Sequence, residues 1–199
     1  EYSVLSEVLT LKDLKKKKIF YNVKGIILSG GPSTVTKSLF PKIPNKIFHL
    51  NIPILGICYG LQLIVKQFNG IVKTNIKKRE FGRVKLIKKK NSLLTKNFFN
   101  KNKSFVWMSH QDSVSKLPLG FSKIASTAQS AMTIIENKKK KLYGIQFHPE
   151  VTHTNNGDII FKNFIFKICN AKKQWKLESE KKRIIKEIKQ TVQKNKVIC

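Results

Sequence analysis

Two short segments of this chain place a thiol, an imidazole and a carboxylate where they could support nucleophilic chemistry. The first is GICYG at residues 56–60, with Cys58 at its centre. The second is FHPE at residues 147–150, which contains His148 and Glu150. Because side chains alternate along an extended segment, His148 and Glu150 would project from the same side. A thiol, a base and a group that orients the base are what thiol-dependent acyl transfer requires.

Taken alone, the surroundings of Cys58 fit a reactive cysteine and a buried structural cysteine equally well. An apolar run at 52–57 precedes it and a helical pattern at 59–68 follows it, which predicts that Cys58 lies at a helix start. The positive end of a helix favours a thiolate. Glycines at 56 and 60 suit a tight strand–turn–helix elbow.

Taken alone, His148 fits a strand-end histidine in ordinary polar contact better than a general base, but its neighbours also allow the second role. Pro149 biases His148 toward an extended backbone. From there the imidazole could accept the Cys58 proton and later pass it to a leaving amine. Glu150 could hold the imidazole in one tautomer.

Two further segments could contribute to a site. The turn SGGP at 29–32 follows an apolar run, and its backbone N–H groups could bind an oxyanion or simply form a tight turn. The segment WMSHQDSV at 107–114 brings His110 and Asp112 close together in sequence. We predict no metal site there, because no second histidine or cysteine with ligand spacing lies nearby.

Apolar strand-like runs alternate with helical patterns along the chain, which predicts an α/β layered sheet. The helices are expected over 59–68, 159–169 and 184–192. We also expect the opening of a strand over 196–199. The remaining strands are expected over 25–28, 52–57, 84–87, 105–108, 124–126, 132–135 and 142–147.

Composition narrows the class of protein. A chain of 199 residues with 41% apolar residues is long and apolar enough for one sizeable core. No run of eighteen apolar residues occurs, so we predict no membrane span. The cysteines are odd in number and far apart, which suits a reducing cytoplasm better than a disulfide framework.

The net charge of +29 invites a nucleic-acid interpretation, which we do not favour. Of the 40 basic residues, only Arg79, Arg83 and Arg183 are arginines, whereas nucleic-acid readers favour arginine for its bidentate geometry. The lysine runs are not interleaved with aromatic residues that could stack on bases. We therefore expect a solvated basic surface and no specific nucleic-acid partner.

Taken together, the motifs resemble those of the class I (triad) glutamine amidotransferases. Within that family they look most like the N-terminal glutaminase domains of GMP synthases, because VTHT follows FHPE. The resemblance covers nearly the whole chain. The matching stretches are GIILSGGPSTV at 25–35, PILGICYGLQ at 53–62, REFG at 79–82, VWMSHQDSV at 106–114 and YGIQFHPEVTHT at 143–154.

The resemblance implies a role for each matching residue. Cys58 would be the nucleophile, with His148 and Glu150 completing the triad. The backbone N–H groups of Gly31 and Tyr59 would form an oxyanion hole. Gln111 stands where many members have glycine, which is tolerable if contacts there are largely through the backbone. The substrate glutamine would contact Gln62, Ser109, His110, Gln111 and Asp112.

The resemblance also implies an architecture and partners. We expect an open, mostly parallel, doubly wound, flavodoxin-like sheet whose first strand is missing. Residues 1–8 would form the second strand of the family. Residues 1–170 would form the amidotransferase domain, and 171–199 the connection into an ATP pyrophosphatase domain. The segment itself would need no cofactor. ATP, Mg and XMP would belong to that second domain of a cytoplasmic enzyme, a homodimer when full-length.

Two alternatives to this interpretation stay open at the level of sequence. One is the glutaminase subunit of another amidotransferase, of the anthranilate, aminodeoxychorismate or carbamoyl-phosphate synthase type. The other is a degenerate, non-catalytic basic scaffold, from which Cys58 or His148 would be expected to disappear early.

Overall fold

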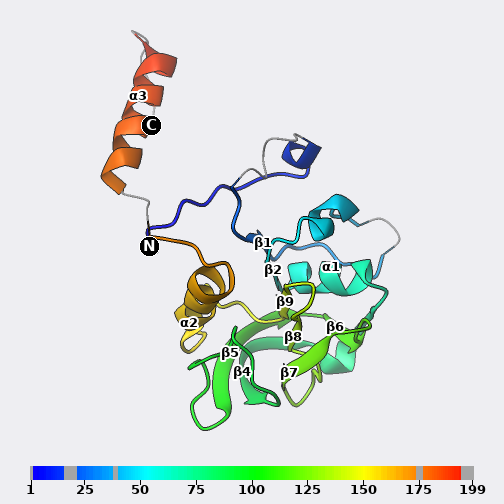
Figure 1. Ribbon diagram of the computed structural model, residues 1–199. Helices are drawn as coiled ribbons and strands as arrows, with labels where there is room; N and C mark the ends of the chain where they lie inside the picture. Colours follow the sequence, from blue (N-terminus) through cyan, green and yellow to red (C-terminus); the bar gives the residue numbers. More distant parts are fainter. Residues whose placement is uncertain (1, 16–21, 38–39, 174–176, 194–199) are drawn as a thin grey trace.

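A seven-stranded sheet forms the centre of the computed structural model, which describes residues 2–15, 22–37, 40–173 and 177–193 (Figure 1). The alternation of strands and helices confirms the predicted α/β class. The strands follow the spatial order β1 (Ile26–Leu28), β2 (Ile54–Ile57), β9 (Leu142–Ile145), β8 (Ile134–Asn137), β7 (Ser122–Ser126), β4 (Glu80–Lys88) and β5 (Lys103–His110).

Parallel pairing is confined to one end of this sheet. β2 lies parallel to β1 and β9, whereas the pairs β9–β8, β8–β7, β7–β4 and β4–β5 are antiparallel. The expectation of a mostly parallel sheet therefore holds for β1, β2 and β9 only, and the sheet is mixed. The reason is visible in the chain: four residues join β8 to β9, and a connection that short can only return antiparallel.

A second, two-stranded antiparallel sheet pairs β3 (Ile71–Thr74) with β6 (Asp112–Lys116). Neither strand was predicted, because both are short and mix polar with apolar residues. β5 ends at His110 and β6 begins at Asp112, so the chain passes from one sheet to the other at Gln111. This crossover turns out to lie beside the candidate site.

Three α-helices accompany the sheets in the described residues. α1 (Tyr59–Gln67) follows β2, and α2 (Gly157–Lys162) continues into a π-helical stretch at Asn163–Ile168. α3 (Leu177–Val192) stands apart from the sheet and from the other helices in Figure 1. Short 3₁₀ turns lie at Asp13–Lys15, Asn45–His49 and Ile76–Lys78.

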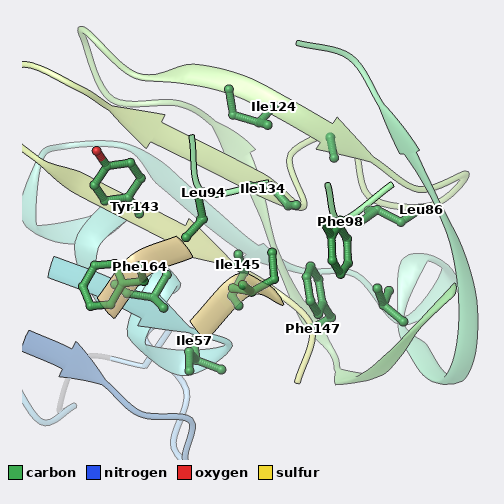
Figure 2. Packing of buried hydrophobic residues seen from close by; sticks show 14 of the residues in the cluster. Ile57, Leu86, Leu94, Phe98, Ile124, Ile134, Tyr143, Ile145, Phe147 and Phe164 are labelled. Atoms are coloured by element: carbon green, nitrogen blue, oxygen red, sulfur yellow. The ribbon is translucent and has the colours of Figure 1, made fainter. Parts of the chain in front are cut away.

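Helices α1 and α2 cover opposite faces of the sheet. Ile135 of β8 packs with α1, whereas its neighbour Ile134 packs on the α2 side, as the alternation of side chains along a strand requires. Figure 2 shows the cluster on the α2 side, where Ile57 and Ile145 from two parallel strands meet Phe164. The same cluster extends to the Phe98 and Phe147 rings, which stack with centroids 5.8 Å apart.

The chain start does not follow the expected strand. Residues 2–8 form no strand, and Leu5 and Val8 are 60% and 98% exposed. A strand needs a neighbour to pair with, and β1 pairs only with β2 among the described residues. The strand expected over 196–199 lies outside the described residues.

The turn between β2 and α1 is sterically tight. Cys58 has φ 51° and ψ −104°, a backbone conformation that non-glycine residues rarely adopt. A Cβ added to Gly60 would lie 2.1 Å from the carbonyl oxygen of Leu28, and one added to Gly56 would lie 2.5 Å from the Gly60 backbone. Only glycine allows β1, β2 and α1 to approach this closely.

We therefore expect Gly60→Ala to destabilise the fold, because the new methyl group must push α1 away from β1. Overpacking of this kind typically costs about 1–3 kcal/mol of the free energy of unfolding, measured by urea denaturation. The control is Gly31→Ala, whose Cβ would meet nothing closer than Tyr59 Cδ1 at 4.0 Å and should leave stability almost unchanged. Equal losses in the two variants would contradict the steric argument.

Candidate functional site

The elbow presents Cys58 at the amino end of α1. Its N–H donates to the carbonyl oxygen of Ile145 at 2.8 Å, and its own carbonyl accepts from the N–H of Gln62 at 3.2 Å. Two polar groups lie near the sulfur: Ser109 O at 3.9 Å and Gln146 Nε2 at 3.7 Å. The thiol is thus held at a helix start, where the backbone favours negative charge.

His148 lies beside both Cys58 and Glu150. Its Nδ1 and Glu150 Oε1 are 2.7 Å apart. The hydrogen bond with Cys58, followed by the one with Glu150, raises the pKa of His148 to about 10, although partial burial lowers it. Burial has the largest single effect and raises the pKa of Glu150, but the hydrogen bond with His148, a backbone hydrogen bond and the charge of His148 together lower this pKa below its ordinary value. The three residues predicted to form a triad are therefore brought together.

The SGGP turn lies directly against this group. A Cβ added to Gly30 would come within 3.2 Å of His148 Cε1 and 3.7 Å of Cys58 Cβ. A Cβ added to Gly31 would lie 4.0 Å from Cδ1 of the Tyr59 ring. Tyr59 is the first residue of α1, where a backbone N–H has no intrahelical acceptor. Gly31 thus lies beside Tyr59, the residue that follows Cys58, and the oxyanion hole formed by their N–H groups stays a prediction.

The segment 109–112 is anchored by side chains that were predicted to contact substrate. Gln62 Nε2 donates to the backbone oxygen of Asp112 at 3.1 Å. The Asp112 carboxylate accepts from the hydroxyls of Thr34 and Thr74. Asp112 thereby links Thr34, just after the SGGP turn, with the nucleophile helix and β3, which is a structural connection that sequence reasoning missed.

His110 is anchored on the other side of this segment. Its Nε2 is 3.1 Å from Glu80 Oε2, and both side chains are almost fully buried. Glu80 and His110 are partners in the β4–β5 register, so the pairing follows from the sheet. The side chains of Ser109 and Gln111 are exposed, and the Gln111 carbonyl accepts from the N–H of Asn75 at 3.4 Å. The REFG motif contained Glu80 but gave no sign of this partner.

Two structural features bear on other classes of function. Among the residues that the structure describes, no group of three or more histidine, cysteine, aspartate or glutamate side chains is placed to hold a metal ion. In the same residues no helix combines the length and the apolar character needed to cross a membrane.

Known proteins similar to this chain agree with the geometry. It is 45% identical over 195 residues to the GMP synthase [glutamine-hydrolyzing] of Prochlorococcus marinus subsp. pastoris, and 44% identical over 190 residues to that of Clostridium botulinum. These matches cover 98% and 96% of this chain but only 36% of each relative. The chain thus spans about a third of the length of these relatives.

A solved structure gives the same family assignment. The crystal structure of a putative GMP synthase subunit from Thermoplasma acidophilum superposes with a TM-score of 0.65 at 31% identity, covering 83% of this chain and 77% of that one. The family model "Glutamine amidotransferase class-I" matches residues 2–168, which include the Cys58 elbow and the FHPE segment. The chain therefore belongs to the class I glutamine amidotransferase family.

Proposed function

We propose that this chain is the glutaminase part of a GMP synthase, which releases ammonia from glutamine for the ATP-dependent conversion of XMP to GMP. The observation that supports the reaction best is the contact of His148 with both Cys58 and Glu150 beside a glycine turn. The choice of GMP synthase rests on the relatives at 44–45% identity. Their names also disfavour the other amidotransferase types.

The first half-reaction forms a thioester. The Cys58 sulfur attacks the side-chain amide carbon of glutamine, while His148, whose raised pKa favours the protonated ring, holds the proton that the sulfur has given up. The tetrahedral intermediate carries its negative charge on the former carbonyl oxygen, which accepts hydrogen bonds from the N–H groups of Gly31 and Tyr59. His148 then gives its proton to the amide nitrogen, the C–N bond breaks, and ammonia leaves the γ-glutamyl thioester.

The second half-reaction hydrolyses the thioester. A water molecule gives a proton to His148 and attacks the thioester carbon. The C–S bond breaks, glutamate leaves, and Cys58 recovers its proton. Glu150 holds the imidazole through the 2.7 Å contact at Nδ1 and stabilises its protonated form. Ser109, Gln111 and the anchored Gln62, His110 and Asp112 would line the substrate side of the thiol.

The remainder of the proposed enzyme lies beyond this domain. Residues 1–170 would be the amidotransferase domain, and 171–199 would lead into an ATP pyrophosphatase domain that binds ATP, Mg and XMP. We also propose a cytoplasmic homodimer for the full-length protein. The separate position of α3 in Figure 1 is compatible with a helix that belongs to the connection rather than to the glutaminase.

Replacement of the nucleophile gives the most specific test of this proposal. Cys58→Ala should abolish glutamine-dependent GMP formation in the full natural polypeptide and leave ammonia-dependent formation intact, because only the thioester step uses sulfur. Both rates are measured with ATP and XMP present. An enzyme that lost both activities equally, while still folded, would contradict the assignment.

An electrophilic glutamine analogue provides an independent readout. It should label Cys58 and spare Cys169, which is buried and whose pKa burial raises to about 12. The labelled peptide is identified by mass spectrometry, with Cys169→Ala as the control that should label like the wild type. Principal labelling at Cys169 would refute the assigned nucleophile.

The elevated pKa of His148 predicts a pH dependence. The His148 ring should titrate near pH 10 rather than 6.5, and Glu150→Gln should lower that midpoint, since it removes one of the partners that favour the protonated ring. NMR of the ring carbon resonances measures both midpoints. Because the folded-state pKa is raised, the stabilisation due to His148 is complete below pH 6.5 and is lost as the pH rises through about 10. A ring that titrates near 6.5 in both proteins would contradict this.

A further inference from the structure

We propose that Thr154 is a positioning residue for His148, because its hydroxyl fixes the backbone of the base to β5. This inference rests on the proposed function, in which His148 is the base. It concerns a residue that touches neither the thiol nor the Glu150 carboxylate in this structure. Thr154 lies six residues after His148 and is 5% exposed.

A closed set of three hydrogen bonds joins Thr154, His148 and Trp107. The Thr154 hydroxyl donates to the carbonyl oxygen of His148 at 2.5 Å and accepts from the N–H of Trp107 at 3.0 Å. The N–H of His148 donates to the carbonyl oxygen of Trp107 at 3.1 Å. Both backbone polar groups of His148 are thus connected to a single residue of β5, one directly and one through the threonine hydroxyl.

This arrangement replaces a strand ladder that has already ended. β9 stops at Ile145, so His148 no longer has a regular neighbour in the sheet. β5 is the last strand in the spatial order, and its outer edge is therefore open to the segment after His148. The N–H of Asn155 also bonds that edge, at Phe105 O with 2.9 Å. The threonine hydroxyl supplies the donor and the acceptor that a ladder partner would have supplied.

Because both neighbours of His148 are fixed, the hydrogen bonds with Thr154 and Trp107 determine the backbone orientation of His148. Phe147 is held by stacking on Phe98. Pro149 is held by the close approach of Gly157, where an added Cβ would lie 2.0 Å from Pro149 O. Between these two fixed points, the peptide plane of His148 is set by its carbonyl bond to Thr154. Its imidazole contacts Glu150, whose side chain is 47% exposed and so offers a less rigid support.

β5 is also the strand that reaches the nucleophile. The carbonyl oxygen of Ser109 lies 3.9 Å from the Cys58 sulfur, two residues along the strand from Trp107. His148 and the Cys58 thiol are therefore both held by β5. Loss of the Thr154 bond would let His148 move relative to this strand and to the thiol. A displacement of about 1 Å in a reacting group can cost about 100-fold in rate.

The test compares Thr154→Val with Thr154→Ser in the full natural polypeptide. Valine keeps the shape but loses the hydroxyl, so kcat for glutamine hydrolysis should fall by about 10–100-fold while KM changes by less than about threefold. Serine keeps the hydroxyl and should stay within about threefold of the wild type. The rate at which iodoacetamide alkylates Cys58 should fall in the valine variant toward that of His148→Ala, and this readout needs no glutamine.

Thr127→Val is the matched control. The Thr127 hydroxyl also accepts from a backbone N–H and donates to a backbone carbonyl, both of Ser130, and it is similarly buried. This variant should lose a comparable pair of hydrogen bonds without any change in kcat or in alkylation. If Thr154→Val does not fold, Thr154→Ala against Thr154→Ser repeats the comparison, because those two differ only by the hydroxyl.

The outcomes separate this inference from the proposed function. Unchanged kcat and alkylation in folded Thr154→Val, or impairment in Thr154→Ser as large as in Thr154→Val, would overturn the positioning role. A wild-type polypeptide without glutaminase activity would overturn the proposed function. The alkylation comparison would then still decide whether Thr154 sets the position of His148 beside Cys58.

Discussion

The close packing of the Cys58 elbow against β1 is the constraint on which the candidate site depends. Gly60 lies so near the Leu28 carbonyl that no side chain fits between them, and Cys58, two residues earlier, has a strained backbone. In return, the sulfur is lifted above the ends of the parallel strands, at the start of α1. The SGGP turn follows β1 directly and therefore lies beside Cys58 and His148.

The two halves of the mixed sheet supply different parts of the site. The parallel strands β1 and β2 position the glycine turn and the nucleophile. The antiparallel edge strand β5 supports the segment that contains His148 and, through Ser109, reaches the sulfur. β9 lies between them and leads directly into His148. The thiol and the base therefore meet where the parallel and antiparallel parts of one sheet join, and relative movement of the two parts would separate them.

The sequence predicted the elements that have strong local signals. Glycines at 56 and 60 and the apolar run before them identified the elbow, and Pro149 with the His148–Glu150 spacing identified the second half of the site. The strands β3 and β6 were missed because neither has a continuous apolar pattern. The mixed character of the sheet was missed because strand periodicity does not reveal which way a neighbouring strand runs.

The supporting contacts could not be predicted from the sequence. The bonds of Asp112 to two threonines, the pairing of Glu80 with His110 and the bridging by Thr154 join residues far apart in the chain or hidden in a turn. Residues 109–112 were expected to contact substrate, and that remains a prediction. What their types alone could not indicate is that the side chains of His110 and Asp112, like that of Gln62, are already engaged in holding the site together.

The central claim is that Cys58 forms a covalent intermediate with the side chain of glutamine, and rapid acid quench with intact-peptide mass spectrometry tests it most directly. The wild-type polypeptide mixed with glutamine and quenched during turnover should show a γ-glutamyl thioester on the peptide that contains Cys58. The adduct should accumulate further when deacylation is slowed. Glutamine turnover at a normal rate with no adduct on Cys58, or with an adduct on another residue, would contradict this account of the site.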